Sequence, residues 1–123
     1  MTLSNVPMTT EARAPTPAVR ADPLLWEVVG RLRAAYLPDR IYLFGSRARG
    51  EQGSDSDYDI LVVVPDDAPV DRRESRLAYQ VLWGLRVAVD VLVWTRTAFD
   101  ARLHLTASLP STVIREGLLL HAA

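Results

Sequence analysis

The sequence contains no cysteine and no lysine, and all fourteen of its basic residues are arginine. Without cysteine there is neither a disulfide scaffold nor a cysteine-based zinc site or nucleophile. Without lysine the chain cannot carry the phosphate-binding P-loop, whose motif requires that residue. No apolar stretch approaches the roughly 20 residues that a membrane helix needs. The net charge of −1 gives no reason to expect a nucleic-acid or membrane partner.

The length and the first residues predict one folded domain behind a flexible lead. A chain of 123 residues is long enough for a single core but not for two. Residues 1–21 are rich in Pro, Thr and Ala and show no periodicity, so we expect a flexible N-terminal segment. This segment lacks the basic start and apolar core of a signal peptide, so we expect a cytoplasmic protein. Residues 22–123 then form the domain.

Helix and strand signals alternate along this domain. Asp22 and Pro23 predict the cap and first position of a helix, which Pro38 closes after Tyr36. The other predicted elements are strands at 40–44, 58–64, 87–94 and 118–121, and helices at 71–85, about 96–103 and 110–116. The near-continuous apolar sequence of the third strand predicts burial on both faces. We expect Trp26, Trp83 and Trp94 in the core, with the edge of a pocket as the alternative for Trp94. The pattern is α/β, with a small mixed sheet flanked by helices.

Aspartates alternate at the start of the second strand, in "SDSDYDILVVV". Alternate residues of a strand share a face, so Asp57 and Asp59 lie about 6–7 Å apart on one side while Tyr58 points to the other. Two carboxylates beside an apolar run repel each other and lose hydration. A divalent metal ion between them removes both costs.

A third carboxylate interrupts the apolar strand "VAVDVLVW". An unpaired buried carboxylate costs several kcal/mol, so Asp90 needs a partner or a metal. If the two strands are neighbours, Asp90 can face Asp57 and Asp59. Three carboxylates suit Mg²⁺, and two such ions about 3.5–4 Å apart form a clamp for in-line phosphoryl chemistry.

The turn between the first two strands provides a complement to these acids. Gly45 ends a strand, and the next residues can begin a short helix whose free N–H groups point at an anion. Ser46 can donate a hydroxyl hydrogen bond, and Arg47 or Arg49 can pair with phosphate oxygens. A phosphate cradle beside an acidic metal site predicts binding of a nucleoside triphosphate with Mg²⁺.

Gly45-Ser46, ten further residues and then Asp57-x-Asp59 resembles the signature of the polymerase-β-like nucleotidyltransferases. The chain from about Asp22 onward looks most like their minimal prokaryotic members, and the resemblance implies that fold. It also implies that Asp57 and Asp59 bind two Mg²⁺ ions, for which Mn²⁺ can substitute, and that Asp90 is a ligand and the general base. Gly45 and Ser46 would hold the β- and γ-phosphates. The family motif does not define the roles of Arg47 and Arg49.

The resemblance also implies a partner. Many minimal nucleotidyltransferases are encoded beside a small helical HEPN-type protein, with which they form an antitoxin and toxin pair. The implied reaction is transfer of AMP from ATP to a tyrosine hydroxyl of that toxin. The alternative is a non-catalytic antitoxin that neutralises its partner by binding. A chain without an acceptor domain can also use a shallow surface or another copy of itself, and the sequence reveals neither the base nor the acceptor.

Other interpretations of the acidic segment are weaker. A solvated loop explains the aspartates alone, but not their spacing from Gly45-Ser46. An EF-hand would use Asp55, Asp57 and Asp59 and would end at Asp66, but Ile60 occupies the position that requires glycine. Asp55 either starts the strand or belongs to the outer shell of the metals. Charge runs usually form solvated helix faces, which is what we expect of the arginines at 72, 73 and 76.

Overall fold

A computed structural model of the chain describes residues 12–51 and 57–123. Its strands form one sheet in the order β3-β2-β1-β4. The elements are, in chain order, α1 (Pro17–Arg20), α2 (Pro23–Tyr36), β1 (Arg40–Phe44), α3 (Gly45–Arg49), β2 (Tyr58–Val64), the 3₁₀ turn η1 (Val70–Arg73), α4 (Arg76–Val81), β3 (Val89–Thr95), α5 (Arg96–Asp100), α6 (Leu109–Glu116) and β4 (Leu118–Ala122). None of the helices in these described residues is both long enough and apolar enough to span a membrane.

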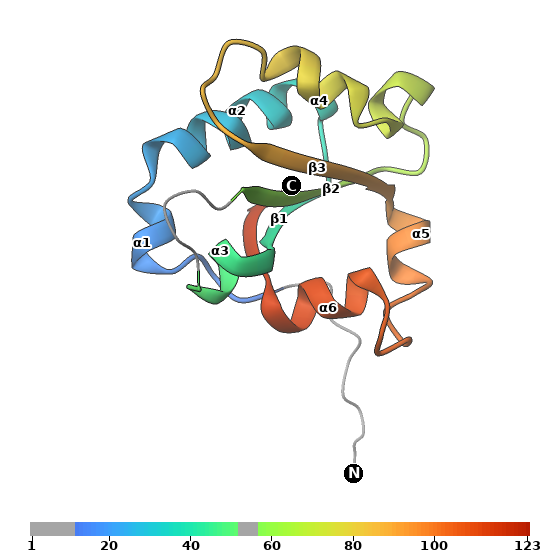
Figure 1. Cartoon of the computed structure of the whole chain (residues 1–123). Coiled ribbons are helices and arrows are strands. Elements are labelled where there is room, and N and C mark those ends of the chain that lie inside the picture. Colours follow the sequence, from blue (N-terminus) through green and yellow to red (C-terminus); the bar gives the residue numbers. More distant parts are fainter. Residues whose placement is uncertain (1–11, 52–56) are drawn as a thin grey trace.

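The sheet is mixed, as predicted, and helices cover both of its faces (Figure 1). β1 runs antiparallel to β2 and β4, whereas β2 and β3 are parallel. α2 and α4 lie over one face, where Leu25, Leu32, Ile41, Ile60 and Val62 belong to the larger core cluster. α5 and α6 lie over the other face, where Tyr42, Leu61, Val63, Phe99 and Val113 form a smaller cluster. The fold is therefore the predicted layered α/β arrangement.

α2 has the bounds predicted from its sequence signals. The Asp22 side chain accepts a hydrogen bond from Leu25 N at 3.2 Å, which satisfies one of the free N–H groups of the first turn. Pro23 occupies the first helical position, where no N–H is needed. The helix ends where Leu37 adopts a left-handed conformation with φ of 48°, immediately before Pro38.

Regular structure is present before Asp22, where the sequence predicts a flexible segment. Residues 17–20 form α1, and Val19 is buried against the core. Trp26 Nε1 donates a hydrogen bond to Val19 O at 3.0 Å, and Leu119 N donates one to Arg13 O at 2.8 Å. These long-range contacts offset the entropy of ordering a segment that has no periodicity of its own. Residues 1–11 lie outside the described part, so the flexible segment stays a prediction there.

The single helix expected at 71–85 is divided into η1 and α4, with Glu74 extended between them. The Tyr36 side chain explains the break. Its hydroxyl donates to Glu74 O at 2.5 Å and accepts from Ala78 N at 2.9 Å. The Tyr36 hydroxyl thus lies between Glu74 O and Ala78 N, the two groups that would bond to each other in a continuous helix, and Ala78 N also donates to Ser75 O at 3.0 Å. α4 ends at Val81, and the chain turns at Gly84, whose φ is 93°.

The expectation that the third strand is buried on both faces is wrong. β3 lies at the edge of the sheet, and most of its residues are only half-buried. Its apolar side chains still pack against the core clusters on both faces. One backbone edge, however, has no neighbouring strand among the described residues. The placement of Trp83 in the core is also wrong, since this side chain is 85% exposed. Trp26 and Trp94 are half-buried and pack against the two core clusters.

Candidate active site

The sheet register brings two of the three predicted acids together. β2 and β3 are parallel neighbours, and Asp59 pairs directly with Asp90. Adjacent strands lie about 4.7–4.9 Å apart, so both carboxylates start from neighbouring points on the same face. Asp57 precedes Asp59 by two residues, just before β2 begins. The expectation that these two strands are neighbours is confirmed. Asp55 lies outside the described residues.

The acids are less buried than the sequence predicts. Asp57 and Asp90 are exposed, and only Asp59 is half-buried. The argument that Asp90 is a buried carboxylate in need of a partner is therefore wrong, because β3 is an edge strand open to solvent. The Tyr79 hydroxyl does donate a hydrogen bond to Asp90 Oδ1 at 3.4 Å.

Asp59 experiences the predicted electrostatic conflict. Partial burial raises the pKa of its carboxyl above the ordinary value, and the negative charges of Asp90 and Asp57 raise it further. The positive charge of Arg49 acts in the opposite direction. Desolvation and like charges both disfavour the ionised form. A cation at this site would relieve both effects at once.

Gly45 lies directly against Asp59. It is the first residue of α3, and its φ of 75° is in the left-handed region that favours glycine. A Cβ at this position would overlap the Asp59 Oδ2 atom and would lie 3.1 Å from Asp59 Cγ. The left-handed backbone and the close approach to the carboxylate therefore both favour glycine here. Ser46 follows at the second position of the same short helix and is half-buried.

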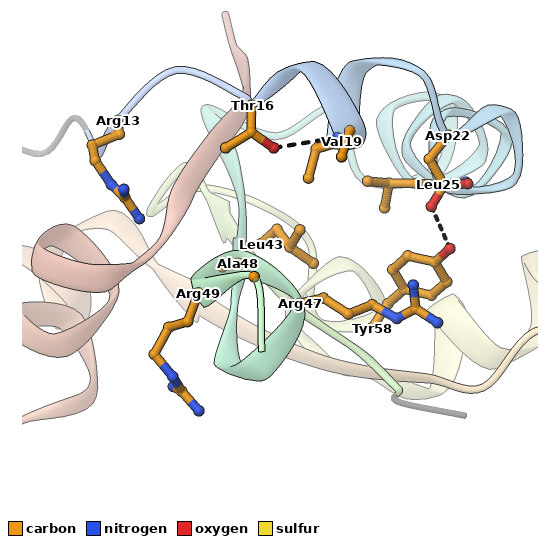
Figure 2. A pocket seen from close by; sticks show the side chains of 12 residues that line it. Arg13, Thr16, Val19, Asp22, Leu25, Leu43, Arg47, Ala48, Arg49 and Tyr58 are labelled. Atoms are coloured by element: carbon orange, nitrogen blue, oxygen red, sulfur yellow. Dashed lines mark hydrogen bonds between the residues drawn. The ribbon is translucent and has the colours of Figure 1, made fainter. Parts of the chain in front are cut away.

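Arg47 and Arg49 point in different directions from α3 (Figure 2). The Arg47 guanidinium lies over the ring of Tyr58, with its central carbon 4.0 Å from the ring centroid. Arg49 forms ion pairs with Glu51 at 3.1 Å and Glu116 at 3.4 Å. Of the two, Arg49 is the one whose charge lowers the pKa of the Asp59 carboxyl.

The sequence indicated that Tyr58 points away from the acids, but it did not identify what this residue contacts. The Tyr58 hydroxyl donates a hydrogen bond to Asp22 Oδ2 at 2.5 Å, beside a pocket of about 170 Å³ that α1, α2 and α3 line (Figure 2). Burial, followed by the hydrogen bond to Asp22, raises the pKa of Tyr58 to about 12. One oxygen of Asp22 thus caps α2 while the other holds the start of β2. The cap signal indicated only the first of these roles.

The donor chemistry of the acids fits a hard divalent cation. Carboxylate oxygens are the ligands that Mg²⁺ prefers, and Asp59 sits where negative charge accumulates. Among residues 12–51 and 57–123, no three His, Cys, Asp or Glu side chains are already arranged to hold a metal. Convergence of the carboxylates on one ion would therefore require their side chains to move from the positions they have here.

Comparison with known proteins identifies the family. Residues 25–118 match the family model of the nucleotidyltransferase domain. This match covers most of the chain, so the chain belongs to the nucleotidyltransferase-domain family. No protein of curated function matches the sequence significantly.

Three solved structures resemble the fold. One is a protein from Sulfolobus solfataricus assigned as a nucleotidyltransferase, with a TM-score of 0.55 and 24% identity over 81% of this chain and 78% of that chain. Another is a toxin–antitoxin with AMP-PNP, with a TM-score of 0.53 and 29% identity over 79% and 73%. A mutant of the toxin–antitoxin MntA–HpeT, in which two aspartates two positions apart become glutamate, has a TM-score of 0.51 and 24% identity over 79% and 73%.

Proposed function

We propose that this nucleotidyltransferase is Mg²⁺-dependent and transfers AMP from ATP to a hydroxyl of a partner protein. The observation that carries the proposal is the register of Asp59 with Asp90, directly beneath the Gly45 turn. The proposed phosphate cradle and the proposed cation site then lie at the same end of these neighbouring strands. The raised pKa of the Asp59 carboxyl supports the role of a cation there.

Each acid has a proposed role in the transfer. Asp57 and Asp59 hold two Mg²⁺ ions, or Mn²⁺ in their place, and Asp90 completes the ligand set. The ions supply positive charge to the phosphate oxygens during the displacement. Asp90 accepts the acceptor's proton while the acceptor oxygen bonds to the α-phosphorus. The bond from that phosphorus to its bridging oxygen breaks, and pyrophosphate leaves.

The residues of α3 bind the nucleotide in this proposal. Gly45 allows the backbone to approach the phosphates, and Ser46 donates its hydroxyl to them. Arg49 pairs with a phosphate oxygen in this proposal. Its positive charge lowers the pKa of the Asp59 carboxyl, which supports a position close to the acids. Arg47 contributes a second positive charge from the side of Tyr58, over whose ring it stacks. Exposed ion pairs are weak, so Arg49 can leave its glutamate partners at little cost.

The acceptor is proposed to be a tyrosine of a cognate HEPN-type helical toxin. The toxin–antitoxin structure with AMP-PNP, which is 29% identical to this chain, supports both an antitoxin role and an adenine nucleotide. The second candidate function is neutralisation by binding alone. The match to the nucleotidyltransferase domain and the register of Asp59 with Asp90 favour chemistry over binding alone.

Intact-mass spectrometry of this chain co-expressed with the product of the adjacent gene tests the proposal. One transfer adds about 329 Da, the mass of an AMP unit, to the partner. The double variant Asp57→Asn/Asp59→Asn should leave the partner unmodified. The matched control is Asp67→Asn, which removes an exposed acid from the loop after β2. A partner that stays unmodified yet is silenced by the wild-type chain would establish the binding-only function instead.

A further inference from the structure

An apolar groove lies beside the start of β3, which is the edge strand of the sheet. It has a volume of about 510 Å³ and is formed by the end of α4, the following turn and the start of β3. Trp83 and Tyr79 line it and are 85% and 48% exposed. Leu82, Leu85, Val87 and Val89 complete its apolar surface. Clustered exposed aromatic side chains mark interaction sites, and Trp and Tyr contribute disproportionately to binding energy.

The groove is joined to the proposed general base by Tyr79. The Tyr79 hydroxyl donates to Asp90 Oδ1 and accepts a hydrogen bond from Val91 N, both at 3.4 Å. The side chain thus reaches from α4 around the open edge of β3. Asp90 does not line the groove, because Val89 does and successive residues of a strand point to opposite faces. A segment lying in the groove would therefore contact Tyr79 and reach Asp90 around the open edge of β3.

The strand order determines which reactant belongs on this side. α3 follows β1, Asp59 lies on β2, Asp90 lies on β3, and the groove is outside β3. The groove and the proposed phosphate cradle are thus on opposite sides of the acids. In an in-line displacement the attacking oxygen and the leaving oxygen are also on opposite sides of the phosphorus. The groove is on the side of the attacking hydroxyl.

We infer that this groove docks the segment of the partner protein that carries the acceptor hydroxyl, an inference that rests on the proposed function. The segment presents an apolar side chain to Trp83, within a few residues of the hydroxyl. It also presents a carboxylate to Arg86, an exposed groove residue that forms no ion pair with the described residues. Apolar contact and charge complementarity together select the acceptor.

Two variants test the inference with the purified adjacent-gene product as the probe. Trp83→Ala should raise the KM for this protein, and its Kd measured by calorimetry, at least tenfold. Its Kd for Mg²⁺–ATP and its kcat at saturating acceptor should stay within twofold of wild type. Arg86→Glu should weaken the same binding, with a smaller effect at high salt because screening weakens charge pairs. The matched control is Leu105→Ala, which removes a 45% exposed apolar side chain outside the groove and should change nothing.

The outcomes separate this inference from the proposed function. Unchanged acceptor binding by Trp83→Ala overturns the docking role. Weakened Mg²⁺–ATP binding by this variant also overturns it, and assigns the groove to the nucleobase. If the wild-type chain binds the partner without modifying it, loss of binding in Trp83→Ala supports docking although transfer fails. If the wild-type chain neither binds nor modifies the partner, the docking inference falls even where nucleotide binding is intact.

Discussion

Replacement of Gly45 by alanine is the most direct test of how the site is built. The residue has a φ of 75°, and a Cβ there would overlap Asp59 Oδ2. Gly50, at the other end of α3, has nearly the same φ of 74°, but a Cβ added there would meet no atom within 4 Å. Both changes place alanine in a left-handed conformation, and only Gly45→Ala also displaces a carboxylate. Gly50→Ala is therefore the matched control.

The expected magnitudes follow from these two geometries. A left-handed conformation costs a residue with a Cβ about 1–2 kcal/mol, so Gly50→Ala should lower the free energy of unfolding by about that amount. Gly45→Ala should cost a further 0.5–1.5 kcal/mol or so, because Asp59 must leave its rotamer. For a chain of this length, about 1 kcal/mol corresponds to a Tm shift of about 4 °C. The effect of alanine on the unfolded chain is common to both variants and cancels in their comparison.

Urea denaturation in EDTA measures the two stabilities, and calorimetry with ATP and Mg²⁺ measures the function. Gly45→Ala should lose metal-dependent nucleotide binding, because its methyl group displaces Asp59 and fills the phosphate approach. Gly50→Ala should bind normally. Equal destabilisation of both variants, together with normal nucleotide binding by Gly45→Ala, would refute the reasoning.

Three further changes probe the electrostatics of the fold. Asp59→Asn should be more stable than wild type at pH 7 in EDTA, since the raised pKa of this carboxyl means that its ionisation destabilises the folded state. This difference in Tm should vanish near pH 3, where the carboxyl is protonated in both the folded and the unfolded state. Tyr58→Phe should lower the free energy of unfolding, measured in urea, by about 1–2 kcal/mol, because the hydrogen bond to Asp22 is lost. In an ultraviolet absorbance titration, the tyrosine with a pKa of about 12 should be absent from this variant. Burial lowers the pKa of the His121 imidazole, so the free energy of unfolding of wild type should fall as the pH falls below about 6.5. An equal fall in a His121→Gln variant would contradict this assignment.

Local signals were sufficient for much of the fold. The cap and proline at the start of α2 are adjacent in sequence, and so are the glycine after β1 and the apolar run of β2. Each element is defined by residues within a few positions of its ends, which is why the bounds of α2, β1 and β2 were predictable. The sequence predicted that Asp90 faces Asp59 only on the condition that the two strands are neighbours, and the parallel pairing of β2 with β3 meets that condition.

Contacts between distant residues explain the differences. The Tyr36 hydroxyl divides the predicted helix by bonding to Glu74 and Ala78, about forty residues away in sequence. No periodicity contains that information. Likewise, the sequence of an apolar strand does not show whether the strand lies at the edge or in the interior of a sheet. The exposure of Asp90 therefore depends on the strand order. Trp83 follows α4 in a turn whose exposure also depends on that order.

At the first residues of β2, one face of the strand carries repelling carboxylates and the other face carries a hydrogen bond that holds the strand. On one face Asp57 and Asp59 repel each other and Asp90, and the positive charge of Arg49 offsets this repulsion only in part. On the other face Tyr58, between the two acids in sequence, is held by Asp22. The strand start is therefore anchored from the side opposite the repulsion, by a hydrogen bond that needs no cation. Because this anchor lies on the other face of the strand, it leaves Asp57 and Asp90 exposed and Asp59 half-buried on theirs.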